Sequence, residues 1–312
     1  MALFAVKQNR VEAPEPIRPR LETVVTPAKI RMESVNVQFA TRQGTLPVLQ
    51  DVSLSISPGE FVCLVGPSGC GKSTLLNIIA GLLRANSGQV YKDERAIIGP
   101  GPDRAVIFQE AGLFPWLSAV QNVEFALKSV RNRRERRERA MEHLKRVQLS
   151  RFADSHPHEL SGGMRQRVAI ARALALDPDV LLMDEPFAAL DVQTRDILIA
   201  EVQRIWLETR KTIVFVTHNV MEAVTLGDRV FCMGTRPGYI KQELPVTLDR
   251  PRMVEDPDTA RIAQHILAHL KDEIAKIVQE ESDYAEKERA NRGEGDHGRV
   301  LYPHTNTMGD GI

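Results

Sequence analysis

The sequence contains few cysteines, few aromatic residues and no long apolar run. Its three cysteines, Cys63, Cys70 and Cys232, are odd in number and stand in apolar or glycine-rich surroundings. This pattern is typical of free thiols in a reducing compartment and argues against a disulfide-stapled scaffold. No uninterrupted apolar stretch approaches the roughly 18 residues that a membrane-spanning helix needs. Any action at a membrane is therefore expected to depend on a partner.

A net charge is also absent, because 41 basic residues balance 41 acidic ones. No overall field therefore attracts nucleic acid or an anionic membrane. The most charged stretch, Arg131 to Arg139, interleaves arginines with Glu135 and Glu138 and carries no aromatic residue, so a solvated helix face explains it better than a nucleic-acid contact. We expect no nucleic-acid partner. The apolar fraction of 43% is ordinary for a globular protein with a sizeable core.

Glycine is concentrated in one stretch that follows the apolar run Phe61 to Val65 and precedes a helical pattern. Its spacing fits G-x-x-x-x-G-K-[ST], and a strand before it and a helix after it are the context that this phosphate-binding loop requires. Glycines allow positive φ and close backbone approach, so that successive N–H groups can surround an anion. The residues expected to bind the phosphates of a nucleotide are Gly66, Pro67, Ser68, Gly69, Cys70, Gly71, Lys72, Ser73 and Thr74.

Four side chains are expected to carry the chemistry of this site. Lys72 can supply charge to the β- and γ-phosphates, and the Ser73 hydroxyl is placed to ligate Mg²⁺. The apolar strand Val180 to Met183 ends in Asp184 and Glu185, at the strand edge where α/β sheets bind their ligands. Asp184 would hold Mg²⁺, directly or through water, and Glu185 would polarise the attacking water.

Buried-type strands alternate with helices along much of the chain. Apolar runs at 61–65, 180–183, 213–216 and 230–233 are separated by helical patterns, the first of which should run from 73 to about 85. This alternation predicts an α/β fold of the P-loop NTPase type with a parallel sheet. Alternating runs at 30–39 and 48–56 predict an N-terminal antiparallel β subdomain. Only helical patterns occur between Gln109 and Leu160, which predicts a helical subdomain at about 110–165.

The two ends of the chain differ in composition from its middle. Residues 1–28 are proline-rich without a sustained period and are expected to form a flexible leader before a main domain over 29–250. Apolar residues then recur every three or four positions and predict a C-terminal helix over 251–281, followed by a disordered tail over 282–312. Within that helix His265 and His269 lie four apart without a third ligand, so surface histidines are favoured over a metal site.

Further motifs give the chain a resemblance to the ATPases of ABC transporters. The run Leu160-Ser161-Gly162-Gly163-Met164 looks like the signature motif of that family, which other P-loop families lack. Gln109 stands at the position of the family's Q-loop glutamine. Asp191 closes a D-loop, and His218 stands at the position of the switch histidine. The resemblance spans about residues 30–248.

The resemblance implies an ATP hydrolase that works as a head-to-tail dimer around two MgATP. It implies that Phe39 stacks on adenine, that Gln109 senses Mg²⁺ and a permease, and that His218 contacts the γ-phosphate. It also implies that the signature residues complete the site of a second copy, or of a paralogous ATPase. The expected roles are catalysis by Glu185, His218 and Lys72, metal ligation by Ser73, Gln109 and Asp184, and nucleotide contacts from Phe39, Asp191, Ser161, Gly162 and Gly163. Asn219 and Ala189, which replace a frequent aspartate and serine, leave the catalytic groups in place.

Further stretches of this sequence resemble one branch of the family in particular. Residues 112–117 and 121–123, and later 235–238 and 249–252, look like importer ATPases of the nitrate, sulfonate and taurine group. This resemblance implies that ATP hydrolysis is coupled to uptake of a small anion through a separate membrane permease. A substrate-binding protein would be an indirect partner, and the chain would sit peripherally at the cytoplasmic face of the inner membrane. An ATPase of an export or lipid-release system, or a soluble ABC ATPase outside transport, is the alternative.

A tryptophan beside the Q-loop suggests where a partner binds. Pro115-Trp116 follows Gln109 closely, and a rigid exposed aromatic residue is a typical interface hot spot for a partner helix. A buried core tryptophan is the alternative, because tryptophan is often largely buried.

Overall fold

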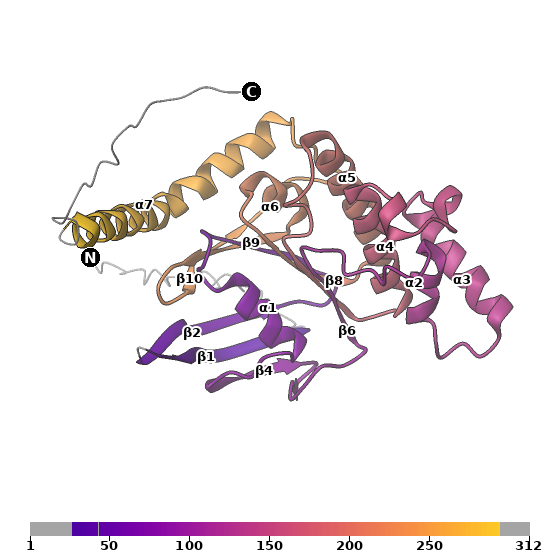
Figure 1. The fold of residues 1–312 in the computed structure, drawn as a ribbon, viewed down its shortest axis with the longest axis horizontal. Coiled ribbons are helices and arrows are strands. Elements are labelled where there is room, and N and C mark those ends of the chain that lie inside the picture. The colour runs from indigo at the N-terminus through magenta and orange to yellow at the C-terminus, as the bar shows by residue number, and fades with distance from the viewer. Residues whose placement is uncertain (1–26, 43, 294–312) are drawn as a thin grey trace, which may run out of the picture.

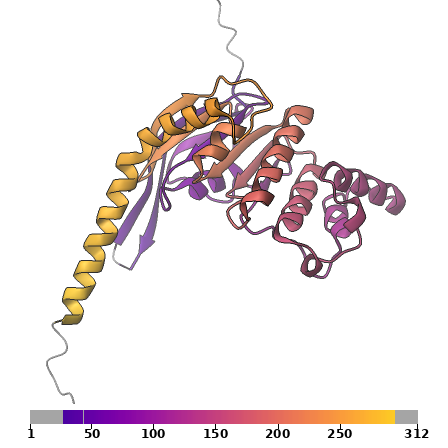
Figure 2. The ribbon, with the colours of Figure 1, turned by 90° about the horizontal axis from the view of Figure 1, so that it is seen from above.

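The computed structural model describes residues 27–42 and 44–293. Two β-sheets and a group of helices make up this part of the chain, with α7 at one end and the helices α2 to α4 at the other (Figures 1 and 2). The predicted leader lies almost wholly outside the described residues, as does the predicted tail beyond Gly293. None of the described helices is long and apolar enough to cross a membrane.

The strands form one antiparallel sheet and one mainly parallel sheet, as predicted. The first sheet has the order β2-β1-β4-β5 and the second the order β10-β9-β3-β8-β7-β6, in which only β10 is antiparallel to its neighbour. The bounds are β1 Ile30–Thr41, β2 Gly44–Ile56, β3 Phe61–Val65, β4 Ser87–Lys92, β5 Arg95–Ala96, β6 Arg104–Ile107, β7 Val180–Asp184, β8 Thr212–Thr217, β9 Arg229–Gly234 and β10 Tyr239–Pro245.

Seven α-helices and two short 3₁₀ turns complete the described part of the chain. Five of the helices begin at side-chain caps that accept a backbone N–H. The caps of α2, α3, α4, α5 and α6 are Ser118, Asn132, Ser161, Asp191 and Asn219. The bounds are α1 Lys72–Ala80, α2 Ala119–Ala126, α3 Arg133–Arg146, α4 Gly162–Ala175, α5 Val192–Thr209, α6 Val220–Leu226 and α7 Pro257–Gly293, with the turns at Ser150–Phe152 and Pro157–Glu159.

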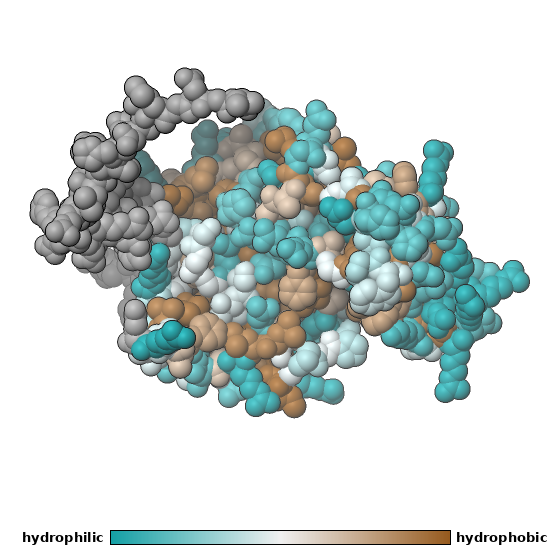
Figure 3. Space-filling view, viewed as in Figure 1, coloured by the Kyte–Doolittle hydropathy of each residue, from teal (hydrophilic) through white to brown (hydrophobic). Residues whose placement is uncertain are grey.

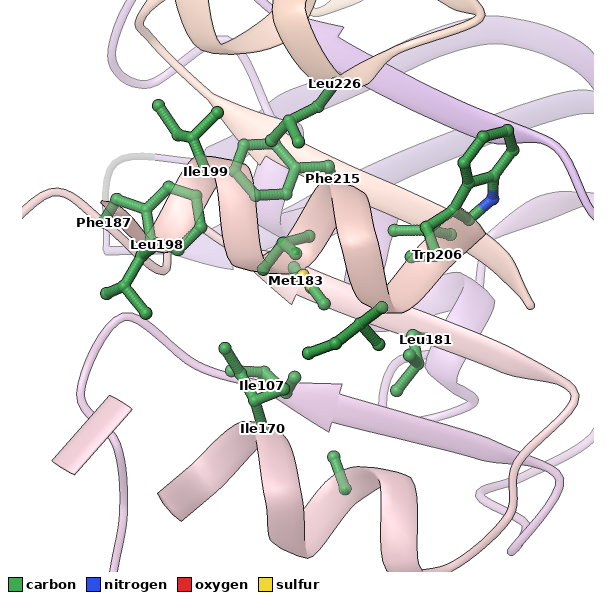
Figure 4. Packing of buried hydrophobic residues seen from close by; sticks show 14 of the residues in the cluster. Ile107, Ile170, Leu181, Met183, Phe187, Leu198, Ile199, Trp206, Phe215 and Leu226 are labelled. Carbon is green, nitrogen blue, oxygen red and sulfur yellow. The ribbon is translucent and has the colours of Figure 1, made fainter. Parts of the chain in front are cut away.

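The parallel sheet is covered on both faces, which explains why its strands are apolar throughout. In β3, Val62 and Leu64 point into the core shared with α1 and the antiparallel sheet, whereas Phe61, Cys63 and Val65 point into the core shared with α4, α5 and α6. Figure 4 shows part of this second core, whose labelled members include Leu181, Met183 and Phe215 from strands, Ile170 from α4, and Leu198, Ile199 and Trp206 from α5.

The helical subdomain carries its charge toward solvent. In α3 the arginines form ion pairs one turn apart, Arg134 with Glu138 at 2.9 Å and Arg139 with Glu135 at 2.6 Å. Only Ala140 and Leu144 of this helix are buried. The α3 side of the molecule is largely hydrophilic in the space-filling view (Figure 3). The prediction of a solvated helix face over Arg131 to Arg139 is therefore confirmed.

Three helix ends differ from the sequence prediction, one of them in α1 and two in α7. The first helix stops at Ala80, because Gly81 takes a left-handed conformation and its N–H bonds back to Asn77 and Ile78. The C-terminal helix begins later than predicted, at Pro257, and continues to Gly293, so the helix end predicted at 281 is wrong. Beyond 281 the sequence loses its apolar period but keeps glutamate, lysine, arginine and alanine, which favour helix without any burial.

Glu273 fastens α7 to the turn between β9 and β10. Its side chain is 1% exposed and accepts hydrogen bonds from the backbone N of Thr235 at 3.0 Å and from Lys276 at 2.9 Å. Lys241 and Tyr239, both on β10, approach the same carboxylate at 3.3 and 3.5 Å. Burial alone would raise the pKa of Glu273, but these donors outweigh burial and lower the pKa to about 2.

This lowered pKa predicts how the stability contributed by Glu273 depends on pH. The carboxylate contributes fully above its unfolded pKa of 4.5, and the contribution is lost as the pH falls toward the folded pKa of about 2. We expect Glu273→Gln to be less stable than wild type by about 3 kcal/mol at pH 7, with the gap shrinking between pH 4.5 and pH 2. Urea unfolding at pH 7, 5, 4 and 3 measures this gap. A gap that stays constant with pH would contradict the assignment.

Candidate functional site

The glycine-rich loop predicted to bind phosphate joins β3 to α1. Gly69 and Gly71 have φ angles of 77° and 93°, in the left-handed region that favours glycine, and a Cβ at Gly71 would lie 2.6 Å from Cδ2 of Leu49. The helix begins directly after this turn without a side-chain cap, so its first N–H groups are available to an anion. The loop therefore has the backbone geometry of a phosphate cradle.

The Lys72 side chain folds back over this loop. Its ammonium donates hydrogen bonds to the carbonyl oxygens of Gly66 and Pro67 at 2.9 and 3.0 Å, and the residue is 5% exposed. Oε1 of Glu185 lies 3.9 Å from the same ammonium. Lys72 thus places a positive charge over the cradle and opposite the predicted water-polarising carboxylate.

Ser73 and Asp184 meet at the edge of the parallel sheet. The Ser73 hydroxyl donates to Oδ1 of Asp184 at 2.9 Å, although the two residues come from α1 and from the end of β7. Burial raises the pKa of Asp184, and the hydrogen bond from Ser73 opposes it only in part. A hydroxyl beside a carboxylate is the hard oxygen donor set that Mg²⁺ prefers, so these residues fit that ion.

Glu185 is held in an unusual backbone conformation beside His218. Its φ is 44°, which is uncommon for a residue other than glycine, and its N–H donates to the carbonyl of Val216 at 2.9 Å. Nδ1 of His218 lies 2.9 Å from Oε2 of Glu185. Strain of this kind persists only where neighbouring structure fixes it, and here β8 supplies both the carbonyl partner and the following histidine. The structure therefore brings together Lys72, Glu185 and His218.

Two residues that the sequence reasoning missed support the histidine segment. Glu222 is buried in α6 and accepts a hydrogen bond from the Thr217 hydroxyl at 2.6 Å. Nε of Arg195 lies 3.5 Å from its other oxygen, and Arg195 also donates to the carbonyl of Leu190 in the D-loop. Burial raises the pKa of Glu222, against the hydrogen bond from Thr217. The sequence signal for Glu222 was a glutamate among the mostly apolar residues 220–226, because a buried carboxylate needs a partner.

The signature segment lies with the D-loop, on the face of the sheet opposite to α1. Ser161 caps α4 by accepting from the N–H of Met164 at 3.2 Å, and Asp191 caps α5 by accepting from Thr194 at 3.0 Å. A Cβ at Gly163 would collide with the Thr194 methyl group. The buried residues of α4 belong to the core on one sheet face, and those of α1 belong to the core on the other. Within one chain, α4 and the phosphate loop helix are thus separated by the sheet.

Gln109 borders a hollow between the helical subdomain and the sheet. A cavity of about 480 Å³ is lined by Gln109, Gly162 and Leu190 among others, so the predicted Q-loop, signature and D-loop residues face one space. The Gln109 side chain is exposed. Gln166, buried on α4, donates to the carbonyl of Phe108 at 3.4 Å and so joins the Q-loop to the signature helix.

Two predicted contact residues are exposed aromatics. Phe39 lies on β1 opposite Leu46, and its role at adenine stays a prediction. Trp116 is 70% exposed, so the alternative of a buried core tryptophan is wrong. The centre of its ring lies 5.6 Å from that of Phe114, with the two rings tilted by 43°, and the centre of the Phe114 ring lies 4.5 Å from that of Phe125. Phe114 and Phe125 line a second cavity of about 400 Å³.

His265 and His269 form no complete metal site in the described part of the chain. Their Nε2 atoms lie 3.4 Å apart on α7, and no third histidine, cysteine or carboxylate among the described residues joins them.

Comparison with known families and curated proteins places this geometry in context. Residues 49–188 match the family described as ABC transporter. The chain is 43% identical over 262 residues to a nitrate import ATP-binding protein of Synechococcus elongatus, with 81% of this chain and 96% of the relative covered. It is 46% identical over 257 residues to a taurine import ATP-binding protein of Rhizobium johnstonii, with 81% and 98% covered.

A solved structure has a similar fold. It is described as the dimeric post-hydrolysis state of an ATP-binding cassette bound to ADP and phosphate, and it is 36% identical to this chain with a TM-score of 0.64. The comparison covers 70% of this chain and all of the other. The predicted fold class is thereby confirmed.

Proposed function

The chain belongs to the ABC transporter family of ATP-binding proteins, and from this premise we propose that it is the ATP-hydrolysing subunit of an importer for a small anion of the nitrate, sulfonate or taurine type. One observation carries the hydrolytic part of this proposal. Glu185 lies between the Lys72 ammonium at 3.9 Å and the His218 imidazole at 2.9 Å, beside a glycine-rich phosphate cradle. The import part rests on the two relatives, which are named for nitrate and taurine import.

The residues of this chain divide the work of phosphoryl transfer among them. The loop amides and Lys72 bind the β- and γ-phosphates and balance their charge as the bond to the leaving group lengthens. Glu185 orients the attacking water and accepts its proton, while His218 fixes the Glu185 carboxylate by the contact between Nδ1 and Oε2. Because these groups are already in place, little reorganisation is needed when ATP binds.

Ser73 and Asp184, with Gln109, are the residues proposed to hold Mg²⁺. Bound there, the ion would neutralise phosphate charge in the transition state. The Ser73–Asp184 contact supports this role for two of the three ligands, and the third is proposed from the resemblance alone. The burial that raises the pKa of Asp184 favours a cation partner, because a cation stabilises the ionised form.

The dimer is proposed because one chain offers half of each composite site. The signature residues Ser161 to Gly163 and the phosphate loop helix belong to opposite faces of the same sheet, so closure over ATP is assigned to the signature segment of a second copy or of a paralogous ATPase. The dimeric cassette that this chain resembles supports the arrangement. Phe39 is proposed to stack on the adenine of the same site.

The permease is proposed to contact the chain at an aromatic cluster made of the exposed Trp116 and Phe125 and the half-buried Phe114 between them. Exposed aromatic rings next to a cavity are typical anchors for a partner helix. Through this contact the chain would sit at the cytoplasmic face of the inner membrane, and a substrate-binding protein would supply the anion on the other side.

Uptake and hydrolysis measured together test the proposal. Cells lacking this chain are expected to lose uptake of one of nitrate, taurine or alkanesulfonate and to regain it with wild type but not with Lys72→Ala. Phosphate release by the purified complex should disappear on chelation of Mg²⁺. If the purified complex hydrolyses ATP but cells lacking this chain keep all three uptake activities, the chain is instead an ATPase of an export or non-transport system.

A further inference from the structure

The turn between β9 and β10 packs directly against the phosphate loop. The N–H of Gly238 donates to the carbonyl of Val48 at 2.8 Å, and the N–H of Gln50 donates to the carbonyl of Gly238 at 2.9 Å. These two hydrogen bonds hold the turn on β2, in contact with the phosphate loop. A Cβ at Gly238 would collide with the carbonyl oxygen of Cys70, so the two backbones are in direct contact.

The same contact continues at the start of the loop. A Cβ at Gly66 would lie 2.9 Å from Sγ of Cys70 and 3.0 Å from the carbonyl oxygen of Met233 on β9. Cys70 itself is fully buried. Because close-packed groups transmit displacement, a shift of the 235–238 turn would move the Cys70 peptide and with it the N–H groups on either side.

The position of this turn is set from outside the sheet, by α7. Glu273 accepts from the backbone N of Thr235 at 3.0 Å and from its hydroxyl at 3.3 Å. This carboxylate is buried, and Lys276 and Lys241 hold it from the other side. A bond between a charged acceptor and a backbone donor is among the stronger hydrogen bonds. The hydrogen bonds between Glu273 and Thr235 therefore fix the position of the turn relative to α7.

We propose that Glu273 is a positioning residue for nucleotide binding, which acts on the phosphate loop through the 235–238 turn and makes α7 part of the ATP site. The proposal rests on the proposed function, because it concerns the same loop. Its contacts run from Glu273 to Thr235, through Gly238, to the Cys70 carbonyl. Residue 273 lies well beyond residues 49–188, the part of the chain that matches the family.

The mechanism predicts an effect on binding and little effect on chemistry. Without the carboxylate the turn gains freedom, and the amides that surround phosphate are no longer fixed in one orientation. Glu185 and His218 are anchored to β8 and keep their geometry. Nucleotide affinity should therefore fall while the rate at saturating ATP is retained.

The test compares Glu273→Ala with wild type in the full chain and its complex. The dissociation constant for ADP, measured by calorimetry, and the KM for ATP are both expected to rise about five- to twentyfold, with kcat changed less than about twofold. Amide hydrogen exchange should accelerate in the peptide covering 66–74. Glu273→Gln keeps an acceptor for the Thr235 N–H and should recover most of the affinity. Asp258→Ala, which removes an exposed carboxylate on the same helix that pairs with Arg261, is the control and should change neither quantity.

A purely structural role would give a different result. In that case exchange would accelerate in α7 alone, and the ADP affinity of Glu273→Ala would stay at the wild-type value, which overturns the proposal. Should Glu273→Ala not fold, Glu273→Asp keeps the charge but withdraws the carboxylate from the Thr235 N–H, and it must weaken ADP binding for the proposal to stand. Wild-type chain that binds no ADP would instead refute the proposed function.

Discussion

Glu185→Gln is expected to lower the rate of ATP hydrolysis by about 10²–10⁴-fold, the usual contribution of a positioned general base. Glutamine has nearly the same shape but cannot accept the proton of the attacking water. The contact with His218 is made through one oxygen, which the amide can still supply, so the local geometry should persist. The substitution therefore isolates proton acceptance from structure.

ATP binding should survive in this variant, because Lys72 and the loop amides are untouched. The Lys72 ammonium keeps its hydrogen bonds to Gly66 and Pro67. Because the substitution removes the negative charge 3.9 Å from this ammonium, the attraction between Lys72 and the phosphates should increase. With binding intact and hydrolysis blocked, two copies are expected to remain closed around ATP. Phosphate release and size-exclusion chromatography with MgATP measure the two effects.

Glu208→Gln is a suitable control for this experiment. Glu208 lies on α5 and pairs with Arg204 on the surface, one turn away, so its loss changes charge by the same amount without touching the site. It should leave turnover unchanged. Near-normal turnover in Glu185→Gln would remove Glu185 from the role of base.

The sequence predicted the parts of the site whose signals are local. The spacing around Lys72 specifies both the loop and the helix after it, and an apolar strand that ends in Asp184 and Glu185 places those carboxylates at the sheet edge. Parallel pairing of β7 with β8 then accounts for the meeting of Glu185 and His218. Fold class followed from the same alternation of strands and helices.

The elements that the sequence left out have weak local signals. Strand β6 spans only Arg104 to Ile107 and contains a charged residue. It is therefore too short to show the apolar pattern from which a strand is predicted. Glu273 and Thr235 are 38 residues apart, and nothing in either surrounding stretch indicates that a helix will dock on a turn. The end of α7 was predicted wrongly for another reason, because residues with high helix propensity continue after the apolar period has stopped.

A buried arginine between β10 and α7 is expected to matter most for stability. Arg252 is 5% exposed and donates to the carbonyl oxygens of Val224, Gly227, Val246 and Leu248. These oxygens come from the end of α6 and from the segment that follows β10, so one guanidinium ties the two together. Burial lowers the pKa of Arg252 to about 10, which still leaves it charged at neutral pH.

Arg252→Ala is expected to lower the free energy of unfolding by about 3–5 kcal/mol, because it leaves several buried carbonyl oxygens without a donor. Arg252→Lys should recover only part of this loss, since an ammonium cannot reach the spread of acceptors that the planar guanidinium reaches. Arg261→Ala removes an exposed arginine that pairs with Asp258 and should cost less than about 1 kcal/mol. Equilibrium unfolding in urea measures all three. If Arg252→Ala unfolds at the same denaturant concentration as Arg261→Ala, then the buried guanidinium contributes no more to folding than a surface ion pair.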